Sequence, residues 1–126
     1  MATIKSFTSL EQSMKLAEIL PLESADYCWG IDDETLHYNN SPYPCAWKDY
    51  TCKEYYIPCW SLAALLEILP KNFGRFYKTI GWYDDAWHCG YMDEDSEVNE
   101  YFTSSESLID ACYEMILKLN ELKGKE

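Results

Sequence analysis

The chain has 126 residues, of which 48% are hydrophobic and 25% are charged, close to the balance of an average globular domain. Ten basic and 22 acidic side chains give a net charge of −12, which repels nucleic-acid phosphates and anionic membrane surfaces. The composition therefore argues against disorder and fibrous repeats. The net charge argues against direct binding to nucleic acids or membranes. A single domain over 1–126 is favoured, because domains of about 100 to 200 residues are typical.

The first predicted element is a helix over about 9–20. Ser9 with Gln12, or Thr8 with Glu11, forms a capping box, and apolar residues follow at helical spacing until Pro21. The composition from 25 to 57 then changes to Tyr, Trp, Cys, Asn and Pro, and the runs 27–29 and 36–38 predict a hairpin. The aromatic-rich segment around Trp47 has no pattern that predicts its conformation.

A second helix is predicted from Pro58, near its start, through a leucine-rich stretch that Pro70 ends. Strands over about 74–83 and 86–92 follow, joined as a hairpin at Asp84 and Asp85.

The acidic loop 93–97 precedes a short strand over 98–102. Ser104 or Ser105 is then expected to cap a long helix that ends at Gly124. One face of this helix carries Leu108, Cys112, Met115, Leu119 and Leu122. Together the elements predict an α+β fold, with one antiparallel sheet of about four to six strands and three helices packed chiefly on one face.

Three stretches resemble a group of short, uncharacterised intracellular proteins of gut Bacteroidales and their mobile elements. These are 9–21 (SLEQSMKLAEILP), 60–70 (WSLAALLEILP) and 107–112 (SLIDAC). The group has no established activity, so the resemblance implies a bacterial or phage setting and an intracellular location, and assigns no catalytic residue.

The N-terminal segment also points to the cytoplasm. It lacks the apolar run of a secretory signal, and no segment approaches the roughly 18 apolar residues that span a bilayer. Six cysteines are therefore expected to be reduced: Cys28, Cys45, Cys52, Cys59, Cys89 and Cys112.

Two groups of residues suggest a metal site. Cys45, Cys52 and Cys59 are spaced by seven, and the adjacent His88 and Cys89 could add zinc ligands, but the close cysteine pairs of structural zinc sites are missing. Asp93, Asp95 and Glu97 alternate like calcium ligands, yet Val98 and Ser104 stand where an EF-hand needs Gly and Glu. Neither a metal nor another cofactor is therefore expected.

Catalysis is also not expected. His37 and His88 are the only histidines, and no phosphate-binding loop or nucleophile motif accompanies them. Cys89 beside His88 suggests a nucleophile and base, but adjacent residues of a strand point to opposite faces of its sheet. We therefore predict a protein that is not an enzyme and has no catalytic residue.

Aromatic and acidic residues are the unusual features, with eleven Tyr, five Trp and four Phe. Exposed Tyr and Trp are enriched in protein interfaces, and acidic loops attract basic partners. The leading hypothesis is a non-catalytic protein that binds another, basic protein, such as an inhibitor or accessory protein of a mobile element. The predicted binding residues are Trp47, Trp60, Trp82, Trp87, Tyr91, Asp84, Asp85, Asp93 and Asp95.

Two alternatives stay open. Aromatic side chains can line a pocket for a small molecule or carbohydrate, and a concave pocket with a few polar groups would favour that function. An exposed edge strand can also pair across a two-fold axis, so a homodimer is a further option.

Overall fold

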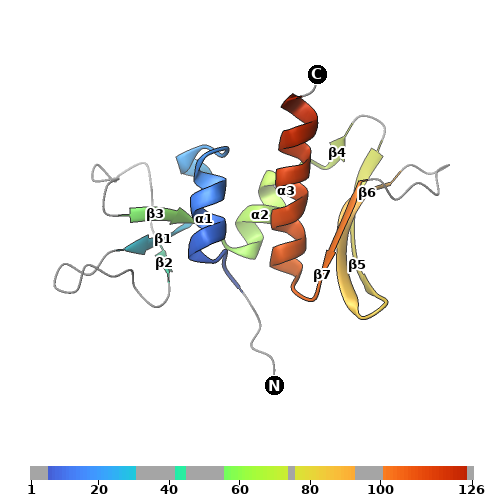
Figure 1. The fold of residues 1–126 in the computed structure, drawn as a ribbon, viewed down its shortest axis with the longest axis horizontal. Helices are drawn as coiled ribbons and strands as arrows, with labels where there is room; N and C mark the ends of the chain where they lie inside the picture. Colours follow the sequence, from blue (N-terminus) through green and yellow to red (C-terminus); the bar gives the residue numbers. More distant parts are fainter. Residues whose placement is uncertain (1–5, 31–41, 45–55, 74–75, 93–100, 125–126) are drawn as a thin grey trace. The chain divides into compact units, whose positions relative to one another are not determined.

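The computed structural model describes residues 6–30, 42–44, 56–73, 76–92 and 101–124 (Figure 1). Its contacts divide the chain into two compact units, Ser6–Ala64 and Leu65–Glu126, called here the N-terminal and C-terminal units. Each unit is described by itself. The single domain expected from the sequence stays a prediction.

The N-terminal unit begins with helix α1 (Leu10–Ala17), and its predicted capping box is confirmed. Ser9 Oγ accepts the Gln12 backbone N–H at 3.2 Å, and Gln12 Oε1 accepts the Ser9 backbone N–H at 2.9 Å. The helix ends before the predicted residue 20, and the 3-10 turn η1 (Leu22–Ser24) follows Pro21. The residue before a proline is disfavoured in helical conformation, which shortens the last turn.

Three strands of this unit form an antiparallel sheet in the order β2-β1-β3. They are β1 (Tyr27–Gly30), β2 (Tyr43–Pro44) and β3 (Tyr56–Cys59). The second arm of the predicted hairpin, 36–38, lies outside the described residues. Pro58 pairs with Cys28 inside β3, so the prediction that it starts a helix is wrong.

Helix α2 (Leu62–Ile68) instead follows Ser61, whose hydroxyl accepts the Ala64 N–H at 3.2 Å and so caps the start of the helix. Asp26 fixes this serine by accepting its backbone N–H at 2.9 Å. The other end of α2 lies before Pro70, as predicted. There Lys78 Nζ donates to the carbonyls of Leu66 and Leu69, at 3.0 and 3.1 Å.

The C-terminal unit contains a four-stranded antiparallel sheet in the order β4-β5-β6-β7. Its strands are β4 (Asn72–Phe73), β5 (Phe76–Tyr83), β6 (Ala86–Met92) and β7 (Phe102–Ser105). The predicted β5–β6 hairpin is confirmed. Its turn residues Asp84 and Asp85 have φ of 52° and 59°, a left-handed pair that matches the twist of a tight hairpin.

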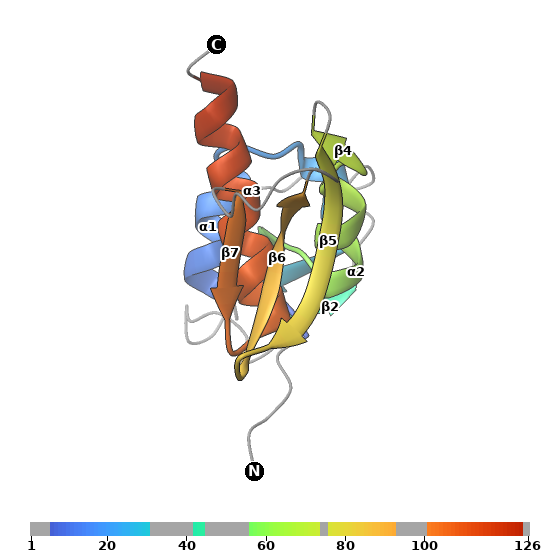
Figure 2. The same ribbon diagram turned by 90° about the vertical axis from the view of Figure 1, so that its right-hand side faces the viewer.

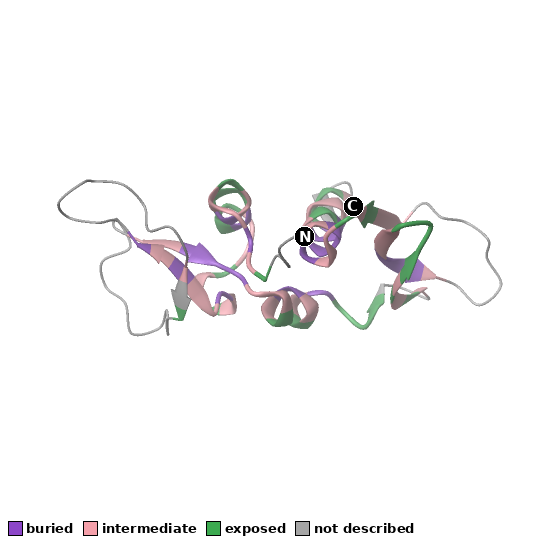
Figure 3. Cartoon of the chain, turned by 90° about the horizontal axis from the view of Figure 1, so that it is seen from below, coloured by how far each residue is buried: buried purple, intermediate pink, exposed green. Residues whose placement is uncertain are grey.

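Helix α3 (Leu108–Gly124) packs behind β6 and β7 on one face of this sheet (Figure 2). The predicted apolar face is confirmed for Cys112, Met115 and Leu119, which are buried. In α1 and α3, buried and exposed residues alternate at helical spacing (Figure 3). Ser104 and Ser105 lie in β7, paired with His88 and Trp87, so the prediction that either one caps α3 is wrong.

The α+β class, the three α-helices and the antiparallel pairing agree with the sequence-based prediction. The described strands form two sheets, however, where one was expected. Strand β3 pairs back onto β1 and then runs into α2, so the strands on either side of this helix pair only with their own neighbours. No helix in the described part of the chain has both the length and the apolar character needed to cross a bilayer.

Candidate functional site

The two faces of the β5–β6–β7 sheet have different surroundings. On the inner face, which packs on α3, Thr103 Oγ1 donates to the Ala111 carbonyl at 2.6 Å and Cys89 is fully buried. Because side chains alternate along a strand, His88 and Met92 of β6 belong to the opposite, outer face. The register places Gly81 beside His88 on that face, and Phe102 beside Gly90.

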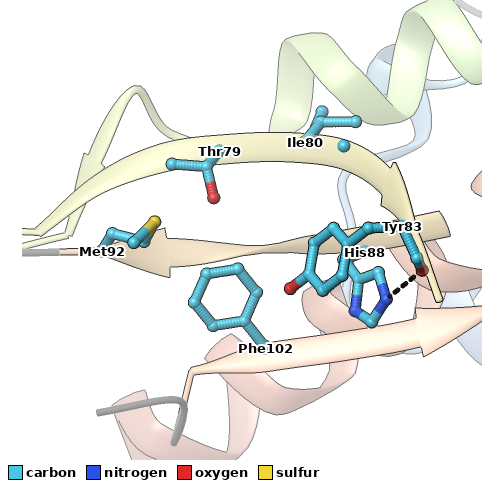
Figure 4. Close-up of a pocket in the computed structure, with 7 residues that line it drawn as sticks. Thr79, Ile80, Tyr83, His88, Met92 and Phe102 are labelled. Carbon is cyan, nitrogen blue, oxygen red and sulfur yellow. Dashed lines mark hydrogen bonds between the residues drawn. The ribbon is translucent and has the colours of Figure 1, made fainter. Parts of the chain in front are cut away.

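The outer face carries a half-open pocket of about 380 Å³ (Figure 4). Its residues come from three strands: Thr79, Ile80, Gly81, Tyr83, His88, Met92 and Phe102. The Tyr83 ring stacks on the His88 ring, with centroids 3.7 Å apart and planes 5° from parallel. His88 Nε2–H donates to the Tyr83 carbonyl at 3.0 Å, which fixes the orientation of the imidazole.

Two glycines give the pocket its shape. A Cβ on Gly90 would meet the Tyr101 carbonyl oxygen and lie 2.6 Å from the Phe102 ring, so glycine is what lets this ring lie across β6. A Cβ on Gly81 would meet no atom within 4 Å, so the space above it is open. The open space over Gly81 therefore belongs to the pocket. The Tyr83–His88 stack, the Thr79 hydroxyl and the Phe102 ring also line it (Figure 4).

Exposed hydrophobic side chains gather on β5. Five large ones are exposed among the described residues, and four of these belong to this strand: Tyr77 (39%), Ile80 (37%), Trp82 (53%) and Tyr83 (52%). Trp82 also packs edge-on against Trp87, with centroids 5.6 Å apart. The exposed acidic turn, Asp84 and Asp85, follows directly. By strand alternation Tyr77 and Tyr83 belong to the outer face, whereas Ile80 and Trp82, which pair with Cys89 and Trp87, belong to the opposite face, so the exposed side chains flank β5 from both sides. We call these four hydrophobic residues and the turn the hairpin patch.

Over part of its length, the same strand has an edge that pairs with none of the described strands. Strand β4 pairs only with Phe76 and Tyr77, and one further bond joins Lys78 N–H to the Lys71 carbonyl at 2.9 Å. Because backbone groups alternate in direction, the N–H and C=O of Ile80 and Trp82 point the same way as those of Lys78, away from β6. No described strand pairs with them.

The structure brings together some of the predicted binding residues. Trp82, Trp87, Asp84 and Asp85 gather at the hairpin end, with Trp87 half-buried. Trp47, Asp93 and Asp95 lie outside the described residues.

The expected exposure of Trp60 and Tyr91 is wrong, because both are fully buried. Their polar atoms are satisfied internally: Trp60 Nε1–H donates to Ser24 Oγ at 3.0 Å, and the Tyr91 hydroxyl donates to the Pro70 carbonyl at 2.6 Å. The sequence-based prediction also missed Tyr77, Ile80, Tyr83 and Phe102. The hairpin register was the available signal, because the turn at residues 84 and 85 places Tyr77 and Tyr83 on the face of His88 and places Ile80 on the opposite face.

Cysteine and histidine chemistry has little geometric support in the described residues. They contain no cluster of three metal-ligating side chains, and Cys45, Cys52 and His37 lie outside them. His88 lines the outer pocket, whereas Cys89 is buried on the inner face. Burial also raises the pKa of the Cys59 thiol, which makes it a poor nucleophile near neutral pH.

The described geometry thus contains an aromatic hairpin patch with an unpaired edge and, on the outer face of the same sheet, a half-open pocket. The resemblance to Bacteroidales proteins stays a prediction. Comparison with protein-family models, with curated proteins and with solved structures gives no significant match to the chain.

Proposed function

We propose that this chain is a non-catalytic binding protein that recognises another protein through the hairpin patch. One observation carries the proposal: of the five large hydrophobic side chains exposed in the part of the chain that the structure describes, four lie between residues 77 and 83, directly before two exposed aspartates. Single exposed hydrophobic residues are ordinary, but a concentration of them with charged neighbours is typical of interaction sites.

The side chains suit such a role. Trp and Tyr are the residues most enriched among those that dominate binding energy, because each buries a large rigid area with little loss of rotamer freedom. Trp82 also packs edge-on against Trp87, which restricts its side chain in the free protein. Less side-chain entropy is therefore lost when a partner binds.

Charge suggests the chemistry of the partner. The patch ends in Asp84 and Asp85, and the chain carries a net charge of −12, so a basic surface is attracted and an acidic one repelled. Association should therefore slow as salt rises from about 0.05 M to about 0.5 M, because the Debye length shortens.

The test compares proteins captured by the wild-type chain with those captured by Trp82→Ala. Met14→Ala is the matched control, because Met14 is also an exposed large hydrophobic residue but lies on α1. We expect a basic partner to be depleted by Trp82→Ala and retained by Met14→Ala. Equal capture by all three proteins would contradict the proposal.

A second variant tests how much the charge of the acidic turn contributes to binding. Asp84→Asn with Asp85→Asn removes both carboxylates and keeps the turn, since Asn also tolerates positive φ. We expect weaker capture at low salt and little difference at high salt. Capture that is unchanged at low salt would show that the acidic turn has no part in recognition.

The second candidate function is binding of a small molecule or carbohydrate in the outer-face pocket. The specific observation in its favour is the stack of Tyr83 on His88 beside the open space over Gly81, a surface on which a planar ring or sugar face could lie. Native mass spectrometry of gently purified protein tests it. A retained organic adduct that Gly81→Val abolishes would favour this function, and a bare mass would disfavour it.

A further inference from the structure

Along residues 79–83, no described strand pairs with the edge of β5 that faces away from β6, and this edge suggests how a partner could bind. Four outward-pointing groups, the N–H and C=O of Ile80 and of Trp82, lie in a row on a strand that already pairs with β6 on its other side. Proteins usually protect such an edge with a bulge, a proline or an inward-pointing charge. Residues 79–83 contain no proline, lysine or other charge.

We propose that an extended basic segment of another protein adds to the sheet as a new strand along residues 79–83 of β5. This inference rests on the proposed function and specifies the partner's form. The backbone of Ile80 and Trp82 supplies the main-chain hydrogen bonds, which is how exposed sheet edges bind peptides. The acidic turn at Asp84 and Asp85 then lies at the end of the added strand and selects basic residues there.

The outer-face pocket adds a side-chain requirement. In an antiparallel partner strand that bonds to Ile80 and Trp82, the intervening residue faces Gly81, and its side chain projects on the outer face. Gly81 leaves that space open, and the Tyr83–His88 stack lies beside it. The segment is therefore expected to place a large apolar side chain at this position.

Charge also argues against a second copy of the chain as the occupant. Edge-to-edge pairing would bring together two proteins of charge −12, each with an acidic turn next to the paired residues. Like charges placed so close repel each other, which disfavours pairing between two copies of the chain. The same negative charge attracts a basic segment and so favours its binding.

The direct test uses a synthetic octapeptide of alternating lysine and valine, with an alternating glutamate and valine peptide as its control. Amide hydrogen exchange of the full chain is followed by NMR. We expect the lysine peptide to slow exchange at Ile80 and Trp82 by about tenfold or more, and the glutamate peptide to have no effect. No slowing by the lysine peptide would overturn the inference.

Ile80→Pro is the matching variant. It removes an outward N–H and replaces the exposed Ile80 side chain, but it breaks no hydrogen bond to β6, because the Ile80 amide points away from that strand, and proline is tolerated at such edge positions. We expect it to weaken lysine-peptide binding by about tenfold or more, with the circular dichroism spectrum unchanged. Gly81→Val, which fills the open space over the pocket, should also weaken binding.

The outcomes separate this inference from the proposed function. If Trp82→Ala weakens capture of the partner but Ile80→Pro does not, the patch binds through side chains alone, and strand addition is overturned while the proposed function stands. If neither variant changes capture, both fail. Protection of Ile80 and Trp82 that grows with protein concentration and needs no peptide would assign the edge to a second copy and overturn the inference.

Discussion

Replacing Gly90 by alanine should destabilise the C-terminal unit strongly for a change of one methyl group. The added Cβ would lie 2.6 Å from the Phe102 ring and closer still to the Tyr101 carbonyl oxygen. That oxygen accepts the Tyr91 N–H at 3.1 Å, so moving it away weakens a hydrogen bond of the β6 strand. Overpacking costs about 1–3 kcal/mol and a lost hydrogen bond about 1 kcal/mol, so we expect a loss of about 2–3 kcal/mol.

Gly81→Ala is the matched control on the same face of the same hairpin. Its Cβ would meet no atom within 4 Å, so the change should be neutral or stabilise by up to about 1 kcal/mol, through lower entropy of the unfolded chain. Urea-induced unfolding followed by circular dichroism measures both variants. Equal free energies of unfolding for the two variants would refute the packing of Phe102 over Gly90 described above.

Two further predictions concern the rest of the chain. Ser9→Ala should lower the free energy of unfolding by about 1 kcal/mol, because the Gln12 N–H loses its capping oxygen, and a urea midpoint equal to that of the wild type would contradict this. Tyr91→Phe removes the hydrogen bond to the Pro70 carbonyl and should cost about 1 kcal/mol at neutral pH. Burial raises the pKa of the Tyr91 hydroxyl above its ordinary value of 10.0. The folded state therefore holds this proton more tightly than the unfolded state does, and the associated stability, complete below pH 10, falls as pH rises further. The wild type should thus lose stability above about pH 10 more steeply than Tyr91→Phe, and parallel curves would contradict the assignment.

Local signals in the sequence predicted the elements whose ends are determined by neighbouring residues. The Ser9 capping box places the start of α1, and Asp84 with Asp85 places the β5–β6 turn, because both act through short-range backbone geometry. Once the turn is known, the register and the two faces of the hairpin follow. This is why Trp82, Asp84 and Asp85 could be predicted at one surface.

Long-range packing explains what the sequence did not predict. Pro58 suits a helix start as well as a strand, and its pairing with Cys28 depends on a segment some thirty positions earlier. The sequence around Trp60 and Tyr91 does not distinguish them from Trp82. Their polar atoms, however, hydrogen-bond to Ser24 and Pro70, which permits full burial. The pocket likewise depends on Phe102 crossing Gly90, a contact between two strands.

The central claim is that the hairpin patch is the recognition surface, and site-specific photo-crosslinking in the native host tests it most directly. A photoreactive residue is placed at position 82 in one protein and at position 14, on α1, in another. We predict a discrete crosslink from position 82 to a basic protein, weakened when Asp84 and Asp85 are replaced by Asn, and no such product from position 14. The same product from both positions, or none from position 82, would contradict the claim.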